Sequence, residues 1–198
     1  MSQYGAFFEG FCVKDYHTET AATVIDETIP GMPGLRLALI AFEYLAAATA
    51  HTLSFMYPGN LAGCRTTASA DAAISQKVLN ATDAPTDPAG NAAAASDIIA
   101  YYTAAGWEFN TVASLATKAI TLTNNIASPV TSGAPIRIFG VTTDNSRFII
   151  NAAASVTTSR NGYFSVMCPF IGDPMYFSAN NATNAGFMNN MVWAYINK

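Results

Sequence analysis

Few side chains in this sequence have the type and spacing that catalysis or metal binding requires. His17 and His51 are its two histidines, and neither belongs to a recognisable metal-binding motif. The three cysteines, Cys12, Cys64 and Cys168, lack the CxxC spacing of a zinc or redox site, and none lies close to a histidine in the sequence. We therefore expect structural histidines and three free thiols, as in a reducing compartment.

The carboxylates do not form a site by their spacing either. Asp83 and Asp87 share a loop with two prolines, but the loop lacks the alternating ligands and the closing Glu of a calcium-binding EF-hand, so we expect turn-capping aspartates. The pair Asp26 and Glu27 has no partner that the sequence places near it. GxSxG, GxxxxGK[ST] and GxGxxG motifs do not occur. We expect no catalytic residue, no metal ligand and no cofactor, and therefore no enzyme.

Four aromatic side chains offer a different kind of site. Residues 101–109 contain Tyr101, Tyr102, Trp107 and Phe109. Aromatic rings at such positions can stack on sugars, but packing in the core or across strands is the commoner use of aromatics in a sheet. Carbohydrate binding is therefore kept as an alternative.

The composition limits the partners of the chain. Of 198 residues, 51% are hydrophobic and 11% are charged, whereas about 25% is usual for charged residues. So little charge favours a subunit that buries much of its surface in contacts. The net charge of -4 and the scattered basic residues argue against nucleic acid, and neither a signal peptide nor a membrane span is indicated.

The regular elements that would position these residues are β-strands. Short β-branched and aromatic runs at 98–103, 108–112, 119–123 and 136–141 are separated by turn-forming residues, which is typical of a β-meander. Residues 35–50 are apolar on both faces, so periodicity fits a buried strand or a helix; we favour a strand that forms a hairpin with 51–57. Turns every eight to twelve residues or so predict an all-β fold, an antiparallel β-sandwich.

The N-terminal 30 residues keep neither the helical nor the strand period. We predict an irregular N-terminal arm over 1–30 and a single sandwich domain over 31–198. The arm either packs over its own sheet or docks on a neighbouring subunit, since aromatics bury much area for little entropy loss. For the second case, the candidate intersubunit contact consists of Tyr4, Phe7, Phe8 and Phe11.

Four stretches, 39–60, 96–126, 132–141 and 174–198, together resemble tailed-bacteriophage virion proteins, and among these the capsid decoration or cement proteins. The similarity lies in alternating small apolar strands, the run AITLT at 119–123, and an Asn- and Ala-rich loop ahead of a terminal aromatic strand. It extends over about two thirds of the chain.

The resemblance implies a jelly-roll-like sandwich that works by contact and has no catalytic residue to carry over. It implies a protein made in the host cytoplasm and located on the capsid exterior of the virion. Its partners would be the major capsid protein and copies of itself, as a dimer or trimer. By bridging shell subunits, such a protein would stabilise the expanded capsid by mass action. The alternative is a carbohydrate-binding sandwich of a phage fibre or tail.

Overall fold

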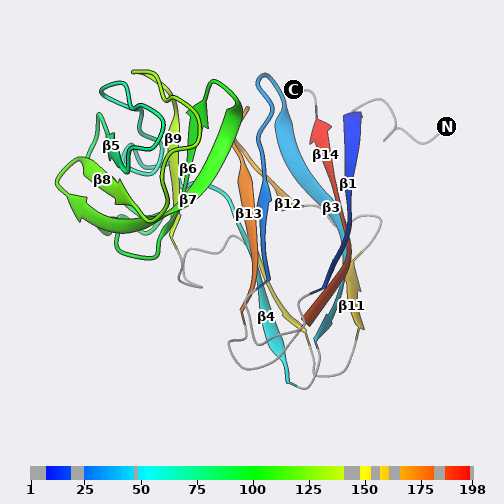
Figure 1. Ribbon diagram of the computed structural model, residues 1–198. Coiled ribbons are helices and arrows are strands. Elements are labelled where there is room, and N and C mark those ends of the chain that lie inside the picture. The colour runs from blue at the N-terminus through cyan, green and yellow to red at the C-terminus, as the bar shows by residue number, and fades with distance from the viewer. Residues whose placement is uncertain are drawn as a thin grey trace. The chain divides into compact units, whose positions relative to one another are not determined.

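The computed structural model describes residues 8–18, 25–46, 49–140, 148–152, 157–160, 166–180 and 186–196 (Figure 1). Every helix or strand assigned within these ranges is a β-strand, and all strand pairs are antiparallel. The all-β, antiparallel fold is therefore confirmed.

The contacts of the chain group into two compact units. Unit 1 consists of Met1–Met56 and Ser146–Lys198, and unit 2 is Tyr57–Asn145. The division into an arm over 1–30 and one domain over 31–198 stays a prediction.

Unit 1 contains two sheets. Sheet A has the order β1 (Phe8–Thr18), β14 (Gly186–Ile196), β3 (Arg36–Ala46) and β11 (Thr157–Arg160), and β12 (Val166–Met167) also pairs with β3. Sheet B has the order β10 (Phe148–Ala152), β4 (His51–Met56), β13 (Met175–Asn180) and β2 (Ile25–Ile29).

The chain changes sheet at most of its connections. The strands β1, β2, β3 and β4 lie in sheets A, B, A and B in turn, and β10, β11, β13 and β14 lie in B, A, B and A. The strand expected within 35–50 is confirmed as β3, but the hairpin with 51–57 is wrong because β4 belongs to the other sheet. The strands of unit 1 pair with strands that are distant in the sequence: β14 pairs with β3, and β13 pairs with β4.

Aromatic rings pack between the two sheets. Phe42 of β3 and Phe55 of β4 lie with ring centroids 5.4 Å apart, and Phe177 of β13 lies 4.8 Å from Phe55. All three are at most 1% exposed. The hydroxyl of Tyr195 on β14 donates to the carbonyl of Pro30, just after β2, at 3.0 Å. The sheets thus form a sandwich with an apolar interior.

The N-terminal segment is regular where the structure describes it, so the expectation of irregular structure is wrong over 8–18 and 25–29. β1 pairs with β14 along its length, and β2 pairs with β13. The register shifts between Phe8 and Gly10, and such an irregularity breaks the alternation that marks a strand in a sequence. Both β1 and β2 lie at sheet edges, where one side of the strand has no partner strand to reinforce a pattern.

Unit 2 contains one sheet, and the predicted meander is confirmed for the three strands within 98–122, whereas the fourth predicted strand, at 136–140, pairs with the first of them and not with the third. The order of the sheet is β5 (Val78–Asn80), β8 (Ala119–Leu122), β7 (Gly106–Ala116), β6 (Ile98–Thr103) and β9 (Ile136–Gly140). The turn between β6 and β7 is tight, since Thr103 pairs with Gly106, whose φ of 111° favours glycine. The outer edge of β9 is covered, because the N–H groups of Ile136 and Ile138 donate to the carbonyls of Thr66 and Cys64.

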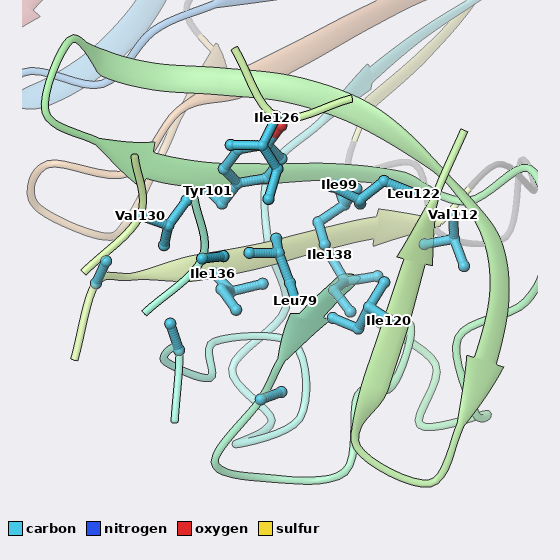
Figure 2. Packing of buried hydrophobic residues seen from close by; sticks show 14 of the residues in the cluster. Leu79, Ile99, Tyr101, Val112, Ile120, Leu122, Ile126, Val130, Ile136 and Ile138 are labelled. Carbon is cyan, nitrogen blue, oxygen red and sulfur yellow. The ribbon is translucent and has the colours of Figure 1, made fainter. Parts of the chain in front are cut away.

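One face of this sheet carries the core of unit 2 (Figure 2). Alternate residues of the strands, such as Ile99, Ile120 and Ile138, are fully buried there with Leu79. The loops close over the same face, where Ile126 and Val130 join the cluster. Unit 2 therefore has a hydrophobic core of its own.

Both ends of unit 2 leave from one strand pair of unit 1. β4 and β10 are antiparallel neighbours in sheet B, and Phe55 lies opposite Phe148. All of unit 2 thus connects two strands that a two-residue turn could join. Insertions are tolerated at such places because the two chain ends are already held close together.

We predict that unit 1 folds after unit 2 is removed. Replacing residues 57–146 with Asn-Gly closes the β4–β10 pair with a turn of the preferred hairpin type. We expect cooperative thermal unfolding and an all-β circular dichroism spectrum. The control is a deletion of 98–140, which removes most of the unit 2 sheet but keeps some of its core residues. This variant should aggregate, because those apolar residues are left exposed. Loss of cooperative unfolding in the Asn-Gly variant would contradict the prediction.

Candidate functional site

The predicted intersubunit residues are only partly within the described structure. Tyr4 and Phe7 lie outside it, and Phe8 and Phe11 lie in β1, the edge strand of sheet A. The backbone of Phe11 is opposite that of Ala194 in β14. An edge strand can pair with another chain through its open side, so their position is compatible with an intersubunit contact, which stays a prediction.

Unit 2 has a second group of aromatic side chains, on the sheet face opposite its core. This aromatic face consists of Tyr102, Trp107, Phe109, Arg137 and Phe139. Tyr102 and Trp107 lie directly opposite each other on β6 and β7, with ring centroids 5.4 Å apart and an edge-to-face angle of 82°. Phe109 stacks on Phe139 at 6.0 Å. Tyr102, Trp107 and Phe109 are partly exposed, whereas Phe139 is buried.

Arg137 is the charged member of the aromatic face. Its guanidinium carbon lies 5.8 Å from the centroid of the Trp107 ring, within the range of a cation–π contact. Its Nη1 donates to the carbonyls of Thr66 at 3.2 Å and Ile136 at 2.9 Å. The residue is 9% exposed, so the cation is held in place by hydrogen bonds and by an aromatic ring. A planar cation beside a partly exposed Trp can bind a polar ligand that has an apolar face.

The four aromatic residues expected as one possible sugar-binding set do not stay together. Tyr101 lies on the core face, 1% exposed, within hydrogen-bonding distance of Asn110. Burial raises the pKa of the Tyr101 hydroxyl, with a further contribution from Glu108. Tyr102, Trp107 and Phe109 share the opposite face, as alternation along the strands requires.

A second polar group lies inside unit 1. Tyr44 of β3 and His51 of β4 are 0% and 3% exposed, and the Tyr44 hydroxyl is 2.5 Å from His51 Nδ1. Burial raises the pKa of Tyr44 to about 12 and lowers the pKa of His51. The expected structural histidine is thus confirmed for His51, which is buried and hydrogen-bonded.

The remaining polar candidates are structural. Asp87 accepts hydrogen bonds from the backbone N–H groups of Ala89 and Asn91, both at 2.9 Å, which confirms a turn-capping aspartate. The Asp83 carboxylate faces the hydroxyl of Thr66 at 3.5 Å. Within the ranges that the structure describes, no group of three or more His, Cys, Asp or Glu side chains gathers in a way that could hold a metal ion.

Cys64 and Cys168 are buried thiols, as expected, and Cys12 lies in β1, where its side chain is not described. The expectation of a third free thiol stays a prediction. Over the described ranges, no helix has the length and apolar character needed to cross a membrane.

Arg137 and Tyr44 were not among the candidate residues found in the sequence. Arg137 had a visible signal, since it is the one charged residue in the apolar strand 136–140, and a buried strand tolerates such a residue only when its charge is satisfied. Tyr44 had none. Its partner is seven residues away in a strand of the other sheet, which only the fold reveals.

Comparisons with known proteins give little support to any assignment. No family model matches the sequence, and no curated protein matches it significantly. Among solved structures, VP17, a capsid protein of bacteriophage P23-77, is 10% identical over 96% of this chain and 97% of that chain, with a TM-score of 0.20. The carbohydrate esterase vb_24B_21 of the Shiga toxin-encoding bacteriophage phi24B is 10% identical over 96% and 91%, also with a TM-score of 0.20. At these TM-scores neither likeness supports an argument.

We predict that Arg137→Met destabilises the protein by about 1–3 kcal/mol, because the carbonyls of Thr66 and Ile136 lose a hydrogen-bond donor and Trp107 loses its cation–π contact. Urea unfolding measures the change. Lys118→Met is the matched control, since Lys118 also donates to a backbone carbonyl, that of Thr82, but on the exposed surface. The control should stay within about 0.5 kcal/mol of the natural protein. Equal effects of the two substitutions would contradict the buried role of Arg137.

Proposed function

We propose that the protein is a structural component of a bacteriophage virion, which binds the outer surface of the capsid and stabilises it by bridging subunits. The observation that carries the proposal is the strand order of unit 1. Two four-strand paths, β1-β14-β3-β11 and β10-β4-β13-β2, are threaded by a chain that changes sheet at most connections. We interpret unit 1 as a jelly roll, an architecture that recurs in viral capsid domains and lectins.

A fold alone does not define a function, so the proposal also needs support from the sequence. The four stretches that resemble capsid decoration proteins lie in both units and include β3, β4, β14 and the unit 2 meander. The low charge of the chain suits a protein that acts by contact. In this proposal the partners are the major capsid protein and other copies of the chain, and the protein catalyses no reaction.

The test is to mix the purified protein with undecorated capsids and to image them by electron microscopy. We expect regular density on the capsid exterior and none for the variant Phe7→Ser/Phe8→Ser, which should remain folded. Phe55→Ser is the control for a core position, because Phe55 is 1% exposed and losing a buried Phe costs about 3–5 kcal/mol.

Two outcomes would contradict the proposal. Binding at the tail, or no binding, would exclude the decoration function. If the Phe7→Ser/Phe8→Ser variant unfolds as Phe55→Ser does, the aromatics belong to the core and not to an intersubunit contact. Light scattering of the free protein distinguishes a dimer or trimer from a monomer.

A second candidate function is carbohydrate binding by the aromatic face of unit 2, and the observation that favours it is the pair of Trp107 and Arg137. Rings of Trp bind the apolar faces of sugars, and the Arg137 guanidinium holds the Trp107 ring in place through the cation–π contact. A glycan bound there would place the protein among the host-recognition proteins of the phage fibre or tail.

For this function we predict that Trp107→Ala abolishes binding on a glycan array while the protein stays folded. Ile74→Ala is the matched control, since Ile74 is a large apolar residue of unit 2 that is 56% exposed and lies outside the aromatic face. It should bind as the natural protein does. If the natural protein binds no glycan at millimolar concentration, this second function is excluded.

A further inference from the structure

The two sheets of unit 1 are joined by a polar contact whose strength depends on a titratable group. Tyr44 comes from sheet A and His51 from sheet B, with ring centroids 5.7 Å apart and a hydrogen bond between them. The contact lies at the C-terminal end of β3. At the N-terminal end of β3, beside Leu37, Tyr195 of sheet A donates to the Pro30 carbonyl. Each end of the sandwich thus has one tyrosine hydroxyl that bridges the sheets.

The imidazole of His51 is satisfied at only one of its two nitrogens. Nε2 is buried and has no hydrogen-bond partner among the described residues. If the Tyr44 hydroxyl donates to Nδ1, the proton of the neutral ring sits on Nε2; in the other tautomer Nε2 is an acceptor. Both neutral forms leave one uncharged group without a partner. The protonated ring instead has a charged N–H donor there, which is far more costly to bury.

Among the residues that the structure describes, no charged residue lies directly opposite Tyr44 or His51 on a neighbouring strand. Met188 of β14 and Thr158 of β11 lie opposite Tyr44, and Ala152 of β10 lies opposite His51. These three residues do not titrate. On β13, Asn180 lies opposite Thr52, the residue after His51, and carries no charge.

Three titratable residues of the described strands lie near this level of the sheets, and none of them is opposite His51 in the strand register. Glu43 precedes Tyr44 in β3, so alternation places it on the other face of sheet A. His17 of β1 is opposite Met188, one strand further from Tyr44. Asp26 of β2 is opposite Ser178 of β13, two positions before the end of the register with β4.

We propose that the Tyr44–His51 contact is an acid-sensitive latch: a proton taken up by His51 leaves a charged N–H at Nε2 buried without a partner, and the cost of burying it separates the two sheets at this end of unit 1. The inference goes beyond the proposed virion function and does not depend on it. A shell protein with this latch would loosen on passage through an acidic environment, whereas the Tyr195 contact at the other end would persist.

The direction of the effect follows from linkage. Burial lowers the pKa of His51 in the folded protein, and the unfolded chain has the ordinary value of about 6.5. The stabilisation is therefore complete above pH ~6.5 and is lost as the pH falls from there through the folded value. At low pH, each pKa unit by which the folded value lies below the unfolded value multiplies the unfolding equilibrium constant by about ten.

The test compares urea unfolding at pH 7.5 and pH 5 for four tag-free proteins: the natural chain, His51→Gln, His17→Gln and Tyr195→Phe. Gln keeps an acceptor for the Tyr44 hydroxyl but cannot titrate. We expect acidification to raise the unfolding constant of the natural protein at least about tenfold more than that of His51→Gln. His17→Gln and Tyr195→Phe should keep the full pH dependence, although Tyr195→Phe is less stable at both pH values.

A second measurement covers the case in which His51→Gln does not fold. The natural protein has two histidines, so nuclear magnetic resonance can follow both imidazole C–H signals through a pH titration. We expect the signal that remains in His17→Gln to stay in its neutral position well below pH 6.5, until the end of the sandwich opens. A His51 that titrates at its ordinary pKa, or an equal pH dependence in His51→Gln, would overturn the proposal.

Discussion

The contact between Phe42 and Phe55 is the interaction on which unit 1 depends most. Their rings come from consecutive strands that lie in different sheets, and Phe177, opposite Phe55 in sheet B, extends the contact along the interior. Because neighbouring strands in the chain are not neighbours in a sheet, no local turn holds the sheets together. Burial of these rings, each worth several kcal/mol, has to do so.

A sandwich of this kind has a polar requirement as well. The strands that carry the apolar residues also place Tyr44, His51 and Tyr195 in the interior or at its ends. Each of these polar side chains needs a hydrogen-bond partner there. Tyr195 finds a carbonyl, which is neutral at every pH, and Tyr44 finds an imidazole. Both contacts join the sheets through a tyrosine hydroxyl, but they differ in their response to acid, because only the partner of Tyr44 can titrate.

The position of unit 2 has a consequence for function. Its two connections leave from β4 and β10, which are already paired, so unit 2 closes no strand of the sandwich. Unit 2 has its own core on one sheet face and the aromatic face on the other. Assembly through unit 1 and recognition through unit 2 are thus separable in the chain, and the two proposed functions need not exclude each other.

The sequence by itself determined the strands of unit 2 and the fold class. Runs of β-branched and aromatic residues between turn residues predicted β6, β8 and β9 nearly to their ends. The pairing of β6, β7 and β8 was predictable because their turns are local, whereas the pairing of β9 with β6 was not. The turn-capping Asp87 was predictable because its turn is local as well. Residues 35–50 were correctly predicted as a strand, but with the wrong partner.

Only the tertiary structure decided the arrangement of unit 1. The pairs β1–β14, β3–β14 and β4–β10 join residues far apart in the chain, and no turn or periodic pattern records such pairings. For the same reason the N-terminal strands looked irregular, and the contact of Tyr44 with His51 could not be foreseen from two residues in different sheets. A sequence states which residues favour strands; which strands become neighbours depends on the burial that the whole chain achieves at once.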